Sequence, residues 1–111
     1  MARIFFVNCN FGKVHLLRKV FASCSFQNCI FNYFSSRKGK FLSCYFESWK
    51  ATSSEMTEEE FYNIHFKNCE FLGVDLAASD FDNCKLKTIR FFKSNLNFIL
   101  VKDVKLWKSK E

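Results

Sequence analysis

Phenylalanine and leucine recur at every fifth position along almost the whole chain. From residue 6 to residue 106, every position in this series holds Phe or Leu, with four exceptions. Twelve of the 16 phenylalanines belong to the series, whose members we call central positions. A period of five does not suit an amphipathic helix, because five residues advance by roughly 140° around the helix axis. The exceptions are Ser36, Ala51, Met56 and Val101.

The six cysteines follow the same period. Every gap between consecutive cysteines is a multiple of five, and each cysteine stands two residues before a central position. In a short extended segment, residues two apart point to the same side. A corner must then turn the chain, and such units stack as a coil whose rungs pair by parallel backbone hydrogen bonds. The cysteines are Cys9, Cys24, Cys29, Cys44, Cys69 and Cys84.

The repeated units resemble the pentapeptide-repeat family. The segments FVNCNF, FQNCIF, FLSCYF, FKNCEF and FDNCKL, with GVDLAASDF between the last two, match its unit of a small residue, Asp or Asn, Leu or Phe, and two variable residues. The resemblance covers essentially the whole chain. It implies an all-β fold, namely a right-handed quadrilateral parallel β-helix with about five coils. Cysteine often replaces the family's alanine, which preserves burial because a free thiol behaves as a small hydrophobe.

The sequence also has a longer period, of four pentapeptides, which independently indicates that each coil has four sides. Central positions taken four repeats apart form four columns, and phenylalanine avoids the third column completely. The residues two before the fourth column depart from the small inward pattern of the other columns. We therefore expect a bulged or outward-turned corner before the fourth face. These residues are Lys19, Gly39, Glu59, Ser79 and Ile99, and the departure spans four consecutive coils.

We expect a single domain over residues 1–111, with irregular segments at 35–40 and 51–60. Both segments lose the Phe/Leu pattern but preserve its register, so 51–60 is either a loop or an irregular rung. Residues 97–111 carry more apolar side chains than the repeat requires. Because the end of a solenoid exposes its core, this stretch is expected to form a cap or a dimer interface.

The cysteine spacing favours buried reduced thiols over disulfides or a metal site. It directs the cysteines to two inner columns, where neighbouring side chains point in parallel. His15 and His65 are expected to face solvent on different faces, which argues against a shared metal or catalytic role. No catalytic, metal-binding or cofactor-binding residue is predicted, and the expectation is a protein that is not an enzyme and uses no cofactor.

Charge is distributed unevenly along the chain. Residues 1–50, 51–85 and 86–111 carry net charges of +7, −6 and +5, which total +6. If the coil register holds, Lys38 lies beside Glu58 and Lys40 beside Glu60, as exposed ion pairs. A second interpretation is a basic patch that binds an acidic protein surface or nucleic acid. The candidate interaction residues are Arg18, Lys19, Arg37, Lys38 and Lys40.

The expected function is a non-enzymatic structural or protein-interaction module. A protein is the first expected partner and nucleic acid the second, and a homodimer through the C-terminal segment is a further expectation. A cytoplasmic location without membrane contact is expected, because the chain has neither an apolar run long enough to span a bilayer nor a signal-peptide pattern.

The family resemblance implies two alternatives to this function. Some pentapeptide-repeat proteins mimic DNA and protect type II topoisomerases, but mimicry needs an acidic surface and the net charge here is +6. A luminal receptor-type pentapeptide domain, as in synaptic vesicle glycoproteins, is the other. The absence of glycosylation sequons and membrane spans argues against it.

Overall fold

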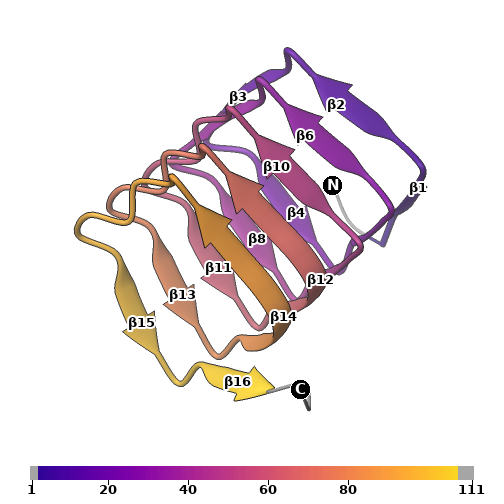
Figure 1. Ribbon diagram of the computed structural model, residues 1–111. Coiled ribbons are helices and arrows are strands. Elements are labelled where there is room, and N and C mark those ends of the chain that lie inside the picture. The colour runs from indigo at the N-terminus through magenta and orange to yellow at the C-terminus, as the bar shows by residue number, and fades with distance from the viewer. Residues whose placement is uncertain (1–2, 108–111) are drawn as a thin grey trace.

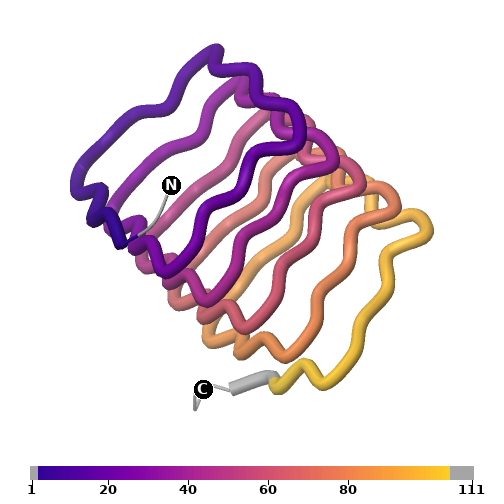
Figure 2. The backbone as a smooth tube through the Cα atoms, turned by 180° about the vertical axis from the view of Figure 1, so that it is seen from behind, coloured from indigo at the N-terminus to yellow at the C-terminus, as the bar shows by residue number. Residues whose placement is uncertain are grey.

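The chain winds as a continuous coil in which each residue lies beside the residue twenty positions later. The computed structural model describes residues 3–107, and every regular element in that range is a β-strand. All strand pairs are parallel, and Phe6, Phe26 and Phe46 are successive partners. Figures 1 and 2 show the coils stacked in sequence order. The prediction of a four-sided parallel β-helix of about five coils is therefore confirmed. We number the coils from residues 3–22 (coil 1) to 83–102 (coil 5).

Faces 1 and 2 belong to one sheet because two strands continue around the corner between them. Strands β12 (His65–Leu72) and β14 (Lys85–Phe92) each contribute to both faces. The other strands of face 1 are β1 (Phe5–Val7), β5 (Ser25–Gln27), β9 (Tyr45–Glu47) and β16 (Lys105–Trp107). The other strands of face 2 are β2 (Asn10–Gly12), β6 (Ile30–Asn32) and β10 (Lys50–Thr52).

Faces 3 and 4 differ in regularity. Face 4 is a five-stranded sheet, whereas face 3 has two strands and then continues as isolated bridges at Glu55, Asp75 and Asn95. Face 3 contains β3 (His15–Leu17) and β7 (Ser35–Arg37). Face 4 contains β4 (Val20–Ala22), β8 (Lys40–Leu42), β11 (Glu60–Tyr62), β13 (Asp80–Asp82) and β15 (Leu100–Lys102).

A residue with left-handed backbone conformation forms each corner. Every fifth residue from Arg3 to Asp103 has a φ between 47° and 65°, and Gly73 is the one glycine among them. This conformation costs a residue with a Cβ roughly 1–2 kcal/mol, and asparagine adopts it more readily than most. The corner requirement explains why Asn precedes Cys in four of the repeated units. These residues are Asn8, Asn28, Asn68 and Asn83.

The central phenylalanines stack on one another from coil to coil. On face 1 the ring centroids of Phe6, Phe26 and Phe46 follow one another at 5.0 and 4.8 Å, with planes 9° apart in both pairs. Rings on adjacent faces meet edge to face, as Phe26 and Phe31 do at 5.5 Å and 85°. Stacked and edge-to-face pairs each add about 0.5–1.5 kcal/mol beyond the area that they bury.

A cysteine or serine two residues before a central position provides a second bond between coils. The thiol of Cys69 donates to the carbonyl oxygen of Phe46 at 3.3 Å. The hydroxyl of Ser79 donates to the carbonyl oxygen of Met56 at 2.8 Å, with the same sequence offset. Cysteine and serine can therefore exchange at this position, because both are small and both donate to the preceding coil.

Trp49 fills the space that Ala51 leaves in the core. Ala51 stands in the face 2 column between Phe31 and Phe71. The indole of Trp49 contacts both phenylalanines, each with a centroid distance of 5.1 Å. Trp49 is 1% exposed, and its Nε1 has no hydrogen-bond partner in the described part of the chain, which costs about 1–3 kcal/mol. The exchange preserves packing volume at the expense of one unsatisfied donor.

The corner before face 4 turns tightly instead of bulging outward. Gly39, Glu59 and Ser79 are buried, so the expected outward corner is wrong for them, while Lys19 is exposed. In coil 4 the chain makes a turn there, closed by the N–H of Ser79 donating to the carbonyl of Leu76 at 3.1 Å. A Cβ on residue 39 would lie 2.6 Å from the carbonyl oxygen of Lys19, so this approach requires glycine.

The segments that lose the sequence pattern still continue the coil. Residues 35–40 enter β7 and β8 in regular register, so this segment is not irregular. In 51–60, Ala51 and Met56 lie in the core and Glu55 bridges to Ser35, which makes the segment a rung with a turn and excludes the loop. Residues 97–107 add another rung through β15 and β16, and 108–111 lie outside the described residues.

Variants that restore the usual repeat residues at positions 49 and 51 test whether Trp49 compensates for the small side chain of Ala51. We expect Trp49→Cys to lower the free energy of unfolding by about 3–5 kcal/mol, because it leaves a cavity beside Ala51. Ala51→Phe alone overfills the same space and costs about 1–3 kcal/mol. The double variant restores the Cys and Phe of neighbouring coils and should regain most of the lost stability. Urea denaturation of the four proteins measures this coupling. Losses that simply add would show that the two sites are independent.

Candidate interaction surface

The five predicted interaction residues lie together on the ridge between faces 3 and 4. Arg18 and Lys38 form the left-handed corner on consecutive coils, with φ of 56° and 55°. Arg37 ends β7 and Lys40 begins β8, on either side of that corner. Lys19 follows Arg18 and is exposed. The structure thus gathers all five into one strip, which we call the corner patch.

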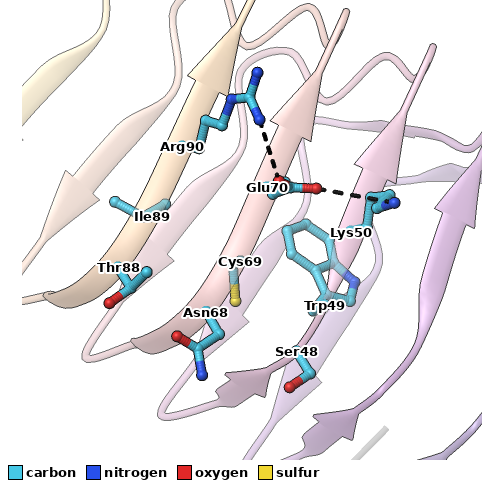
Figure 3. A pocket seen from close by; sticks show the side chains of 9 residues that line it. All are labelled: Ser48, Trp49, Lys50, Asn68, Cys69, Glu70, Thr88, Ile89 and Arg90. Carbon is cyan, nitrogen blue, oxygen red and sulfur yellow. Dashed lines mark ion pairs between the residues drawn. The ribbon is translucent and has the colours of Figure 1, made fainter.

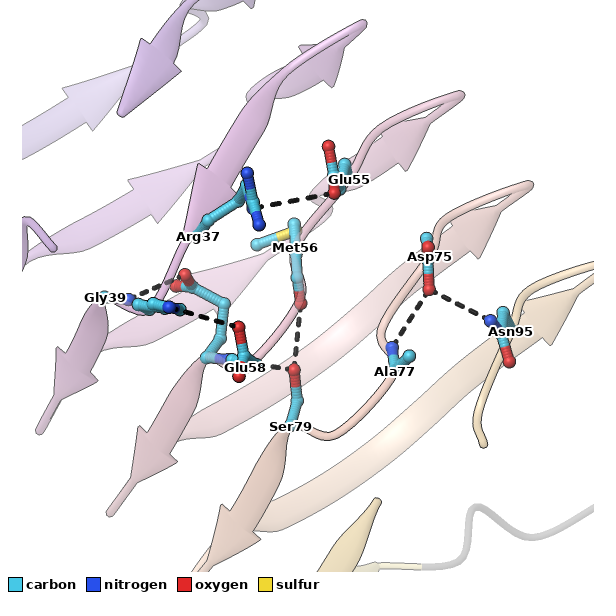
Figure 4. Close-up of polar contacts among 11 residues, drawn as sticks. Arg37, Gly39, Glu55, Met56, Glu58, Asp75, Ala77, Ser79 and Asn95 are labelled. Carbon is cyan, nitrogen blue, oxygen red and sulfur yellow. Dashed lines mark hydrogen bonds and ion pairs between the residues drawn. The ribbon is translucent and has the colours of Figure 1, made fainter. Parts of the chain in front are cut away.

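Three cations of the corner patch contact carboxylates of the next coil. All six side chains are about half exposed, so each pair contributes at most about 1 kcal/mol. Figure 4 shows Glu55 and Glu58 in these contacts. The ion pairs predicted for Lys38 and Lys40 are confirmed. The nitrogen–oxygen distances are 3.7 Å for Arg37–Glu55, 4.0 Å for Lys38–Glu58 and 3.8 Å for Lys40–Glu60.

The unpaired positive charge of the corner patch lies in coil 1. Within residues 3–107, neither Arg18 nor Lys19 has a carboxylate within ion-pair distance. In coil 2, the corresponding positions hold Lys38 and Gly39, which cannot neutralise them. The patch therefore has a cationic end in coil 1 and a charge-paired part in coils 2 and 3.

A buried carboxylate, Glu59, lies beneath the corner patch. Its side chain occupies the space beside Gly39 and Ser36, and Glu59 is 1% exposed. Its Oε2 accepts a hydrogen bond from the N–H of Gly39 at 2.9 Å, while Oε1 has no partner among the described residues. Burial raises the pKa of Glu59 above the ordinary carboxyl value, and hydrogen bonds from Gly39 and Ser36 oppose that rise.

The cysteines belong to the core. All six are free, five are buried, and Cys9 in coil 1 is partly exposed. Burial raises the pKa of Cys44, Cys69 and Cys84 to about 11. These thiols therefore stay protonated at neutral pH, whereas a nucleophile or metal ligand would be a thiolate. The prediction of reduced thiols packed inside the coil is confirmed, with Cys9 only partly buried.

A surface hollow of about 340 Å³ lies over the corner between faces 1 and 2. Figure 3 shows Glu70 between Lys50 and Arg90, with ion-pair distances of 3.9 and 3.6 Å. The lining holds no histidine, and the thiol of Cys69 has a raised pKa, so the hollow lacks an activated nucleophile. Its side chains are Ser48, Trp49, Lys50, Asn68, Cys69, Glu70, Thr88, Ile89 and Arg90.

The two histidines are exposed on different faces, as predicted. His15 lies in β3 of face 3, and His65 begins β12 on face 1. Among residues 3–107, no three His, Cys, Asp or Glu side chains converge in a way that could hold a metal ion. The same part of the chain has no helix long and apolar enough to cross a membrane.

The last described coil exposes apolar side chains. Phe98, Leu100 and Val101 are 86%, 65% and 59% exposed. Val101 is a central position, so the inner side of the chain is open at this residue. A dimer contact through this end stays a prediction.

Sequence analysis missed a second group of cations, on face 1. Lys85 lies beside His65, which lies beside Tyr45, and Lys67 is two residues from His65. The paired residues are separated by four pentapeptides in the sequence. Sequence analysis used the period of four pentapeptides for the inward residues only. The same period applied to the outward residues would have shown this group.

Solved structures of low sequence identity are similar to this chain. No family model and no curated protein matches the sequence. Among solved structures, the pentapeptide repeat protein Rfr23 from the cyanobacterium Cyanothece 51142 is 12% identical, with a TM-score of 0.43 over 92% of this chain and 90% of that chain. Full-length QnrB1, a plasmid-mediated fluoroquinolone resistance protein, is 12% identical, with a TM-score of 0.36 over 96% and 92%. The fold assignment rests on the register of the chain itself.

The raised pKa of Glu59 predicts a pH-dependent stability. The folded state binds the proton more tightly than the unfolded state, so stability should fall as the pH rises from the ordinary carboxyl pKa to the raised value. Glu59→Gln removes this slope, because an amide can accept the same bond from Gly39 without a charge. Urea denaturation from about pH 4 to pH 8 measures the difference. Glu60→Gln, which loses only an exposed ion pair, should keep the slope, and an unchanged slope in Glu59→Gln would contradict the assignment.

Proposed function

We propose that this chain, which resembles the pentapeptide-repeat family, is a non-enzymatic module that binds an acidic protein surface through the corner patch. The observation that carries the proposal is the unpaired charge of Arg18 and Lys19 at the end of a strip of ion pairs. An acidic partner can neutralise this end without first breaking a pair within the chain. Electrostatic complementarity of this kind favours specificity and fast association.

The ridge that carries the corner patch is held by hydrogen bonds along its length. The N–H of Arg18 donates to the carbonyl of Arg37 at 2.9 Å, and the N–H of Lys40 donates to the carbonyl of Lys19 at 2.9 Å. The backbone is therefore ordered before any partner binds. Binding then requires ordering of the side chains alone, which lowers the entropic cost.

We further propose that the protein is cytoplasmic and has no catalytic activity. Self-association is proposed as a second contact. Six free thiols suit a reducing compartment. Phenylalanine fills the coil interior, so reactants have no cleft there. The exposed Phe98, Leu100 and Val101 form the surface through which two copies would meet.

DNA mimicry has less support in the charge distribution. Carboxylates lie beside one another as Glu60 and Asp80, and as Glu55 and Asp75, but these columns cover only coils 3 and 4. The net charge is +6, whereas a duplex DNA mimic needs a continuous phosphate-like surface.

Charge reversal in coil 1 tests the corner patch. We expect proteins captured from a cell extract by the natural chain to include a partner that Arg18→Glu/Lys19→Glu no longer captures, because the free cationic end is reversed. The matched control is Arg3→Glu/Lys13→Glu, which changes the same net charge on other corners of coil 1. The control should retain the partner, as judged by quantitative mass spectrometry. Equal loss in both variants, or no reproducible partner, would overturn the proposal.

A supercoiling assay with DNA gyrase and a quinolone addresses the mimicry alternative. We expect no protection of gyrase at stoichiometric protein, because the surface is basic overall. Protection in this assay would replace the present proposal with the alternative.

A further inference from the structure

Face 1 carries two adjacent columns of basic side chains in its C-terminal half. One column runs from His65 to Lys85 and Lys105, and the other places Lys67 beside Lys87. Direct neighbours in these columns lie on strands about 4.8 Å apart. Like charges placed directly opposite across strands are destabilising. The sequence therefore maintains a positive surface here at a cost in stability.

This arrangement differs from the charged column on face 2. On face 2 the column alternates, since Glu70 lies between Lys50 and Arg90 and contacts both. On face 1 the neighbouring acid is Glu47, whose Oε2 lies 3.8 Å from Nζ of Lys67. Lys85 has His65 and Lys105 as its neighbours within the column. The charges of Lys85 and Lys105 are therefore not cancelled within this column.

Two shallow hollows on face 1 meet at a pair of aromatic rings. The rings of Tyr45 and His65 lie 6.0 Å apart between centroids, with planes at 58°. One hollow places these rings beside lysines, and the other places them beside small polar side chains. The first, of about 190 Å³, is lined by Tyr45, His65, Phe66, Lys67, Lys85 and Lys87. The second, of about 250 Å³, is lined by Ser43, Cys44, Tyr45, Asn63 and His65.

The imidazole of His65 is suited to stack as a neutral ring. Burial lowers the pKa of His65, and the positive charge of Lys85 lowers it further. The ring is then uncharged at neutral pH, while the adjacent lysines carry the positive charge. Face 1 thus offers flat aromatic groups and cations side by side.

We propose that this half of face 1 binds single-stranded nucleic acid. Lys67, Lys85 and Lys105 contact the phosphodiester backbone, and a base stacks on Tyr45 or His65. Lysines that follow the backbone beside aromatic rings that stack bases are the usual elements of such surfaces. The net charge of +6 attracts a polyanion from a distance. An acidic peptide would use the lysines but would have no need of the rings, which favours nucleic acid. The proposal is independent of the protein partner at the corner patch, which lies on a different part of the coil.

Fluorescence anisotropy with a labelled ten-nucleotide oligouridylate tests the proposal. Binding at about 50 mM salt should weaken as salt increases. The slope of log affinity against log salt should be about −2, as expected when three lysines neutralise phosphates of a single strand. Absence of binding at the lowest salt concentration, about 50 mM, would overturn the proposal.

Two classes of variant separate phosphate contacts from stacking. Lys85→Glu should weaken binding at least tenfold and reduce the magnitude of the slope, because a phosphate contact is lost. Tyr45→Ala should weaken binding about tenfold without changing the slope, whereas Tyr45→Phe should bind like the natural chain because the ring remains. Lys13→Glu makes the same charge change as Lys85→Glu, outside face 1, and serves as the matched control. Equal weakening in Lys13→Glu and Lys85→Glu would show attraction by net charge alone and overturn the site.

Competition with other anions identifies the ligand class. A ten-residue polyglutamate peptide and inorganic phosphate should each displace the oligonucleotide at least tenfold less effectively than unlabelled oligouridylate. If polyglutamate competes equally and Tyr45→Ala has no effect, face 1 is a surface for acidic proteins and the nucleic-acid proposal is wrong. Circular dichroism of each variant confirms that the β-fold is retained before binding is compared.

Discussion

The parallel hydrogen-bond ladder between residues four pentapeptides apart determines which residues fit at the corners, in the core and on the outer faces. It places successive coils about 4.8 Å apart, close to the separation at which phenylalanine rings stack in these columns. It also needs a left-handed residue at every corner, from Arg3 to Asp103, to turn the chain without breaking the register. Asparagine at several corners, cysteine or serine two residues before several central positions, and phenylalanine at the centre are therefore three consequences of one spacing. A residue at any of these positions must therefore also pack against its neighbours in the coils before and after it.

Because the coils are coupled in this way, a departure in one coil is compensated by a residue from another part of the repeat. The indole of Trp49 takes the space of the phenylalanine missing at Ala51, at the same level of the stack. Glu59 reaches back to Gly39 and Ser36 of the preceding coil, where both residues are small. Trp49 keeps the core apolar but leaves its Nε1 donor unsatisfied. Glu59 brings a carboxylate into the interior. Both follow from the requirement that protein interiors have few voids.

Much of the fold could be predicted because it follows from periodicity, whereas the departures depend on three-dimensional volume. The central columns, the inward cysteines and the pairing of Lys38 with Glu58 all come from counting in fives and twenties. The corner at Gly39 and Glu59 could not be predicted this way, because a glutamate normally avoids burial. Its burial depends on the space left by Ser36 and Gly39 and on the donor N–H that Gly39 provides. Segment 35–40 was misjudged for a related reason: backbone pairing preserved the rung although the side-chain pattern had lapsed.

The same ladder gives the two cationic surfaces different physical properties. On the ridge, most cations of the corner patch have a carboxylate one coil away, so their field is short-ranged except near Arg18 and Lys19. On face 1, Lys85 and Lys105 are direct neighbours of like charge, so their potentials add. Screening at physiological salt acts over about 8 Å, which spans roughly two coils, so like-charged neighbours reinforce one another whereas alternating neighbours cancel. The sign order within each outward column therefore determines how far the field of each surface extends.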